Sequence, residues 1–171
     1  MNKSKKALLV VAFSNFRDEE LFDTQAELEK AGIETTIAST RTGTAKGMLG
    51  GEAQVQIAID DADSADYDAI VFIGGGGASI YFNNSRAHEL AKSAYSSGKI
   101  LAAICIAPSI LANAGMLKGK KATCFPSEAQ NLKSKGAICT GKPVEIDGRI
   151  ITADGPKSAH SFGKAIANAL K

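Results

Sequence analysis

The stretch KILAAICIAPSILANAG, residues 99–115, places a cysteine between two different kinds of sequence. The first half is an unbroken apolar run, which is typical of a strand covered on both faces of a sheet. The second half has small and apolar residues at helical spacing, and Pro108 suits the first turn of a helix. The stretch therefore predicts a buried strand followed directly by a helix, with Cys105 at the turn between them.

The same alternation of apolar runs and amphipathic helices continues in both directions along the chain. Strands are predicted at residues 6–13, 33–39, 67–73, 100–105 and 121–125, a loop with an edge strand or hairpin at 47–59, and a hairpin at 143–152. Helices are predicted at residues 18–32, 85–99, 126–136 and 158–171. Strands that alternate with helices of this length form right-handed βαβ units. We therefore expect one α/β domain over residues 1–171, with a doubly wound, mostly parallel sheet and helices on both faces.

Composition and charge exclude several classes of protein. The chain has 20 Lys and Arg against 18 Asp and Glu, a net charge of +2, which is too balanced for a protein that binds nucleic acid through its phosphates. No apolar stretch approaches the roughly 20 residues of a membrane span, and the apolar run at residues 7–13 lacks the cleavage pattern of a secretory signal. The three cysteines form no CxxC pair, which disfavours a disulfide framework or a zinc site. We expect a cytoplasmic protein with neither nucleic acid nor membrane as a partner.

Three unusual loops follow predicted strands, at residues 14–20, 74–79 and 105–109. In a doubly wound sheet such loops meet at the carboxyl ends of the strands, where ligands bind. The four consecutive glycines that begin the second loop match no nucleotide-binding pattern, since Ser79 stands where GxGxxG requires glycine. Two explanations remain open for these glycines: they aim backbone N–H groups at an anion or carbonyl oxygen, or they form a tight loop that needs positive φ.

The sequence alone allows two interpretations of Cys105. Unpaired amides at the start of the following helix would stabilise its thiolate and lower its pKa from the reference value of about 8.5, which would make it a nucleophile. Alternatively, Cys105 is a small buried apolar side chain at the end of a core strand.

The sequence resembles the DJ-1/PfpI superfamily, and within it the DJ-1/ThiJ branch, from about Lys6 to Leu170. The motifs that carry the resemblance are ALLVVA, AGIETTIAS, VFIGGGG, AAICIAPSILANAGMLKGKKAT and IITADGP. The resemblance implies a flavodoxin-like sandwich, a homodimer and no cofactor or metal.

The resemblance also assigns roles to particular residues. It implies that Cys105 is a nucleophile on a strained elbow and that Glu20 is a protonated carboxyl that hydrogen-bonds the cysteine sulfur. From the residues alone, Glu20 would be a solvated acid at a helix start, where its negative charge interacts favourably with the helix dipole. By the same resemblance, backbone amides of Gly75 or Gly76 and of Ile106 form an oxyanion pocket.

Two positions depart from the family pattern. Relatives with peptidase-like chemistry carry histidine where this chain has Ile106, and another part of the family has a pocket histidine where this chain has Phe125. The two histidines of the chain, His88 and His160, lie in predicted helices away from the strand ends. A Cys–His pair is therefore not expected, and peptidase activity is disfavoured.

The other two cysteines receive no role from the sequence. Neighbouring residues of a strand point to opposite faces, so Cys124 faces away from the pocket if Phe125 faces it. A part for Cys124 as a resolving thiol of Cys105 is thus disfavoured, and Cys139 is expected to be an ordinary loop or strand cysteine.

Two functions remain in competition. In the first, Cys105 and Glu20 act without a cofactor on small reactive carbonyls, as a glyoxalase III or deglycase, with a small aldehyde or glycated molecule as substrate. In the second, the protein is a non-enzymatic stress sensor or chaperone that uses oxidation of Cys105. Met48 and Leu49, ahead of a predicted edge strand, offer an apolar surface for the expected homodimer.

Overall fold

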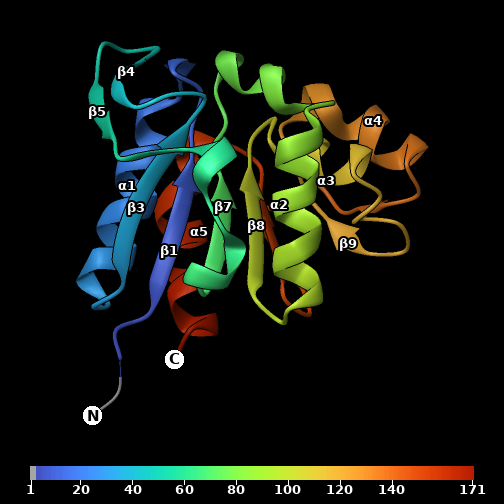
Figure 1. The fold of residues 1–171 in the computed structure, drawn as a ribbon. Helices are drawn as coiled ribbons and strands as arrows, with labels where there is room; N and C mark the ends of the chain where they lie inside the picture. The colour runs from blue at the N-terminus through green and yellow to red at the C-terminus, as the bar shows by residue number, and fades with distance from the viewer. Residues whose placement is uncertain (1–2) are drawn as a thin grey trace.

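A seven-stranded, mostly parallel sheet forms the centre of the protein in the computed structural model, which describes residues 3–171 (Figure 1). The strand order is β11-β12-β8-β7-β1-β3-β6. The strands of this sheet, in chain order, are β1 (Lys6–Val10), β3 (Glu34–Ser39), β6 (Ile57–Ala58), β7 (Ala69–Phe72), β8 (Ile100–Ile104), β11 (Val144–Asp147) and β12 (Ile150–Ala153). Only β11 runs antiparallel to its neighbour, because it forms the predicted hairpin with β12.

Helices cover both faces of the sheet, as the sequence predicts for a doubly wound fold. They are α1 (Asp18–Lys30), α2 (Ser85–Ser96), α3 (Pro108–Asn113), α4 (Ala129–Ser134) and α5 (Ala159–Ala169). In Figure 1, α2 lies in front of the sheet while α1 and α5 lie behind it. Leu8 packs into the cluster beneath α2 and α3, and its neighbour Leu9 packs into the cluster beneath α1 and α5. Consecutive residues of a strand thus supply opposite faces, which is why the central strands are apolar throughout.

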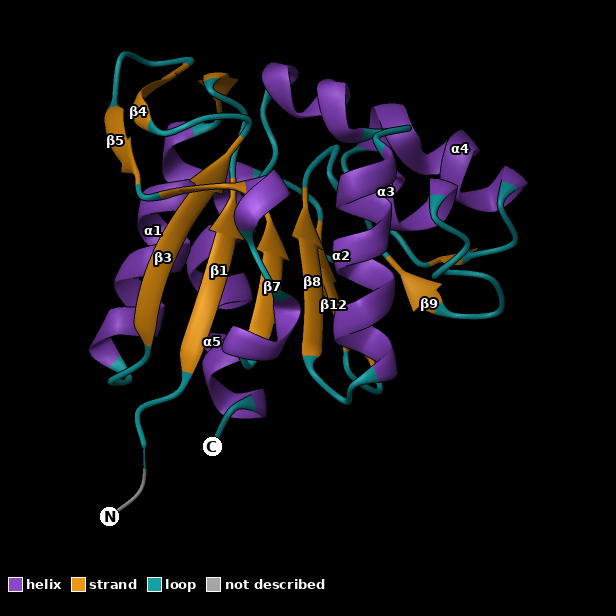
Figure 2. Cartoon of the chain, viewed as in Figure 1, coloured by secondary structure: helices purple, strands orange, loops and turns teal. Residues whose placement is uncertain are grey.

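The segment predicted as a loop with an edge strand or hairpin forms a hairpin that starts earlier than expected. Strands β4 (Gly43–Gly47) and β5 (Glu52–Val55) pair antiparallel, and β2 (Ser14–Phe16) joins β4 to complete a three-stranded sheet. Figure 2 shows β4 and β5 at the edge of the molecule nearest β3. β4 contains two glycines and a single fully buried residue, Ala45, so it has little of the alternation that identifies a strand.

The strand predicted at residues 121–125 is shorter in the structure. β9 (Lys121–Ala122) pairs with β10 (Ile138–Cys139) in a separate two-stranded parallel sheet. The strand stops because the Thr123 N–H donates to Oγ1 of Thr152, at 2.9 Å, instead of to a strand partner. The helix predicted to follow begins with a 3-10 turn at Pro126–Glu128 before α4.

Within residues 3–171, no helix is both long enough and apolar enough to cross a membrane.

Candidate active site

The predicted turn at Cys105 is a strained elbow. Cys105 directly follows β8 and has a φ of 66°, a left-handed backbone conformation that residues other than glycine and asparagine rarely adopt. Such a residue costs about 1–3 kcal/mol and persists only where its surroundings hold it. Here the Cys105 N–H donates to the Ala153 carbonyl at 3.0 Å, and its carbonyl accepts from the Phe125 N–H at 2.8 Å. The elbow is therefore fixed from two sides.

The glycine loop lets three segments approach one another closely. A Cβ at Gly74 would collide with the Glu20 carboxylate and with Cβ of Cys105. A Cβ at Gly75 would collide with the backbone of residues 15–17, and Gly75 also has a φ of 101°. The tight loop with positive φ is confirmed at Gly75, and Gly74 is needed for close packing; that the loop aims N–H groups at an anion or carbonyl oxygen stays a prediction.

Glu20 lies in the first turn of α1 and is completely buried. Among residues 3–171, neither carboxyl oxygen has a hydrogen-bond partner of ordinary geometry; the polar groups that face them are the Cys105 thiol and the Gly74 amide. Burial raises the pKa of Glu20 from its usual 4.5 to about 7, against the opposing effect of the Cys105 thiol. The carboxyl is therefore largely protonated below neutral pH. The alternative interpretation of Glu20, a solvated acid at the helix start, is therefore wrong.

The pKa of Cys105 is raised, and the expected lowering by a helix start is wrong. Burial raises the pKa of the thiol to about 12, and the charge of Glu20 adds to this, while the amides of Gly75 and Ile106 oppose it. The helix contributes little because α3 begins only at Pro108 and has six residues. Glu20 and Cys105 thus titrate as a pair that carries a single negative charge above neutral pH, since the second ionisation is pushed far higher.

The backbone amides that face the sulfur are those of Gly75 and Ile106. Of the two glycines expected at the oxyanion pocket, Gly75 faces the sulfur, whereas the Gly76 N–H donates to Sδ of Met48 at 3.4 Å; the pocket itself stays a prediction. Met48 lies just after β4, so the hairpin reaches the edge of the site. The sequence could not show this contact, since it depends on how the two sheets are placed.

A cavity of about 780 Å³ opens beside the elbow. It is lined by Arg17, Glu19, Phe125, Pro126, Pro143, Asp154, Gly155, Pro156, Lys157, Ser158 and Ser161. Phe125, predicted as a pocket residue, lies on this wall with its ring against Gly155. Arg17 and Asp154 are not among the predicted site residues, although both immediately follow strands and so lie where a site is expected.

Arg17 provides a cation at the junction of the cavity and the buried pair. Its Nε and one terminal nitrogen donate to the two Glu19 carboxylate oxygens at 2.9 and 3.0 Å. This contact raises the pKa of Arg17, and the charges of Glu20 and Cys105 raise it further. Arg17 therefore stabilises the negative charge of the pair.

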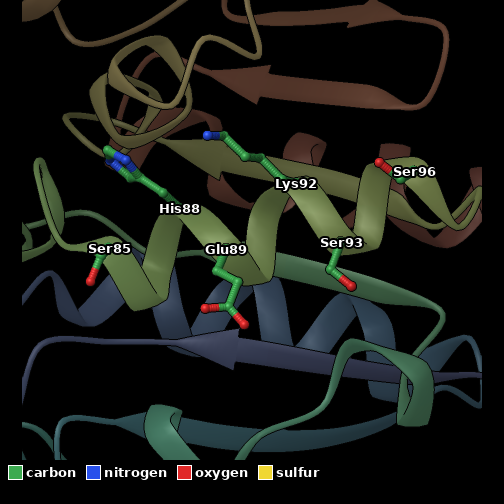
Figure 3. Close-up of a pocket in the computed structure, with 6 residues that line it drawn as sticks. All are labelled: Ser85, His88, Glu89, Lys92, Ser93 and Ser96. Carbon is green, nitrogen blue, oxygen red and sulfur yellow. The ribbon is translucent and has the colours of Figure 1, made fainter.

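The two histidines lie away from the site, as predicted. His88 is on α2, where its Nε2 contacts the Phe82 carbonyl at 2.8 Å. His160 on α5 contacts Glu27 and Asp23 of α1, at 3.1 and 3.5 Å. A second depression, of about 530 Å³, runs along the outer face of α2 and contains His88 but none of the predicted site residues (Figure 3). Within residues 3–171, no three His, Cys, Asp or Glu side chains are grouped so as to hold a metal ion.

Residues 5–169 match the DJ-1/PfpI family. The chain therefore belongs to this family, and the resemblance inferred from the elbow and the glycine loop is confirmed. It is 44% identical to an uncharacterized protein of Methanocaldococcus jannaschii, over 99% of this chain and 84% of that protein. It is 29% identical to a protein named deglycase from Pyrococcus abyssi, over 96% of this chain and 99% of that one. The solved ThiJ/PfpI domain protein of Brachyspira murdochii superposes with a TM-score of 0.96 at 34% identity, covering 99% of this chain and 98% of that chain.

Proposed function

We propose that this protein is a cysteine-dependent enzyme that acts on small reactive carbonyls without a cofactor, as a glyoxalase or deglycase in stress protection. The observation that carries the proposal is the buried Glu20–Cys105 pair. A cavity lies next to it, with Glu19 and Phe125 in its wall. A carboxyl with a pKa of about 7 is suited to accept and return protons near neutral pH. The name deglycase borne by the Pyrococcus abyssi relative supports the same reaction class.

With methylglyoxal as substrate, the first step is addition of sulfur to the aldehyde carbon. The thiol proton of Cys105 passes to the Glu20 carboxylate as the C–S bond forms. The carbonyl oxygen becomes an alkoxide, which the amides of Gly75 and Ile106 stabilise until the proton held by Glu20 passes to it. The product of this step is a hemithioacetal on Cys105.

The second step moves a proton between neighbouring carbons. Glu20 takes the proton from the hemithioacetal carbon and returns it to the adjacent carbon, while the hydroxyl proton passes to the neighbouring carbonyl oxygen. The adduct becomes a lactoyl thioester with no external oxidant. Water then hydrolyses the thioester, releasing lactate and restoring the thiol. The sum is methylglyoxal plus water giving lactate. With a glycated amine or thiol, the Cys105 sulfur would displace the amine or thiol from the carbonyl-derived carbon. The leaving group departs with the proton of the Cys105 thiol, and the same hemithioacetal remains on Cys105.

The test is lactate formation from methylglyoxal, with neither glutathione nor metal added. We expect slow turnover, because no histidine shares the proton transfer. Cys105→Ala should abolish it and Glu20→Gln should reduce it strongly, whereas the matched thiol control Cys139→Ala should leave it unchanged. The proposal fails if the protein is alkylated once per chain without releasing lactate, or if Cys105→Ala makes lactate as fast as the parent.

The alternative is a redox sensor or chaperone that works without turnover. Ile106 and Phe125, which stand where relatives have histidine, favour it. Cys105 would take up two oxygen atoms from two molecules of hydrogen peroxide, releasing two waters, and the protonated Glu20 carboxyl would donate a hydrogen bond to the resulting sulfinate. Absence of lactate, together with a peroxide-dependent gain of two oxygens at Cys105, would favour this function.

We further propose that the protein acts as a homodimer in the cytoplasm. Met48 and Leu49, 46% and 64% exposed, form an apolar surface at the rim of the site. All three cysteines are free thiols, which fits a reducing compartment.

A further inference from the structure

Cys124 and Cys139, 15 positions apart in sequence, are brought to the same side of the small β9–β10 sheet. Cys139 is the register partner of Ala122, and the Thr140 N–H extends the pairing by donating to the Ala122 carbonyl at 2.9 Å. Cys124 follows Ala122 by two positions, so it projects to the same side of the extended chain as Ala122. The side chains of Cys124 and Cys139 are therefore diagonal neighbours.

Packing agrees with this placement. Both side chains belong to the apolar cluster beneath α2 and α3, with Cys124 in its buried part and Cys139 at its half-buried margin. Burial raises the pKa of Cys124 to about 12, and the next largest effects come from the charge and hydrogen bonding of the Cys139 thiol. The two thiols therefore pack in the same apolar cluster and lie close enough to influence each other's ionisation.

This dithiol is separate from the elbow. Cys105 packs into the cluster on the opposite side of the central sheet, beneath α1 and α5. The backbone link between them is the hydrogen bond from Phe125 N–H to the Cys105 carbonyl. Chemistry at the dithiol therefore does not consume the proposed nucleophile.

We propose that Cys124 and Cys139 form a reversible disulfide when the protein meets hydrogen peroxide. Cys139, the more accessible thiol, reacts first: its sulfur takes one oxygen from the peroxide to become a sulfenic acid, and one water is released. The Cys124 sulfur then attacks the Cys139 sulfur, displacing its hydroxyl, which leaves as a second water with the proton of Cys124. One peroxide is reduced and two thiols are oxidised in total.

The second step depends on the proximity of the two thiols and needs no preformed thiolate. Burial holds the pKa of Cys124 at about 12, so its thiol keeps its proton until its sulfur attacks and the hydroxyl of Cys139 departs. The bond closes a covalent loop around residues 125–138, which include α4.

The experiment treats the full-length Cys105→Ser chain with equimolar hydrogen peroxide, so that the elbow thiol does not compete. We expect a mass loss of two hydrogen atoms, loss of both alkylatable thiols, and recovery of both on adding dithiothreitol. Trypsin digestion without reductant should yield residues 122–133 joined to residues 136–149, because Pro143 blocks cleavage after Lys142. The same joined peptide is sought in the unmodified chain, which keeps the test valid if the serine variant folds poorly.

Two single variants serve as matched controls in the same background. Cys124→Ala should leave Cys139 as a sulfenic acid that reacts with dimedone, and Cys139→Ala should leave Cys124 slow to oxidise because it is buried. The proposal is overturned if the joined peptide is absent while Cys139 carries two or three oxygens. It is also overturned if both thiols remain open to alkylation after peroxide, or if bridges form only between chains.

Discussion

The buried carboxyl of Glu20 makes the stability of the protein depend on pH in a way that one substitution should remove. Its pKa lies near 7 in the folded protein, compared with the usual 4.5 expected in the unfolded chain. Each pKa unit corresponds to about 1.4 kcal/mol, so the shift of about 2.5 units corresponds to about 3 kcal/mol. Since the group is fully buried, no reduction for solvent screening is needed.

The unfolded chain releases the Glu20 proton at a lower pH than the folded protein does, and this difference sets the direction in which stability changes with pH. Below pH 4.5 the carboxyl is protonated in both states, and the stability contribution is fully present. Between pH 4.5 and 7 the unfolded chain ionises while folded Glu20 stays protonated, so rising pH favours unfolding. Above the folded pKa both states are ionised, and about 3 kcal/mol of the free energy of unfolding has been lost relative to acid pH.

Glu20→Gln keeps the size of the side chain and removes the titration. Urea unfolding of both proteins from pH 4.5 to 8.5 should show the parent losing about 3 kcal/mol relative to the variant as pH rises. Cys105→Ala is the companion variant: the Cys105 thiol lowers the Glu20 pKa, so its loss should move the transition to higher pH. Parallel pH profiles for the parent and Glu20→Gln would refute the reasoning, because they would mean that Glu20 titrates normally.

Two further predictions follow from the glycine loop and the exposed hairpin. Gly75→Ala should lower the free energy of unfolding by about 1–3 kcal/mol, the order of magnitude of backbone strain, because Gly75 has positive φ and is closely packed. Gly76→Ala, where the added Cβ meets open space, should change the free energy of unfolding little. Equal effects of the two substitutions in chemical denaturation would contradict this prediction. Light scattering should give a mass near twice 17.7 kDa, and Leu49→Arg should shift it toward the monomer; a parent that is monomeric at high micromolar concentration would exclude the proposed dimer.

Much of the fold follows from local sequence patterns. The runs that become β7 and β8 are apolar at every position, and only strands covered on both faces need such composition. The glycine that follows α1 and the Asp147-Gly148 turn mark boundaries through backbone conformations that depend on one or two residues. Where the pattern was weak, as in β4 and β9, the predicted boundaries were displaced, because those short strands depend on distant partners.

The chemistry of the site depends on contacts that local patterns do not contain. The sequence located Cys105 at a turn, and the family resemblance pointed to Glu20. The direction of the Cys105 pKa was nevertheless wrong, because burial and a neighbouring carboxyl outweigh the start of a short helix. The hydrogen bond from the Gly76 N–H to Met48, 28 positions away, likewise depends on where the hairpin packs.

Local patterns therefore predict the order of the helices and of the longer strands, the doubly wound topology and the position of the elbow, since these depend on periodicity and on residues adjacent in the chain. Tertiary contacts establish which groups share a proton and which cysteines are neighbours. Cys124 and Cys139 look unrelated along the chain and become neighbours only when β10 pairs with β9. Proton affinity and thiol proximity both depend on burial and on through-space distance, and neither quantity is set by the spacing of residues in the sequence.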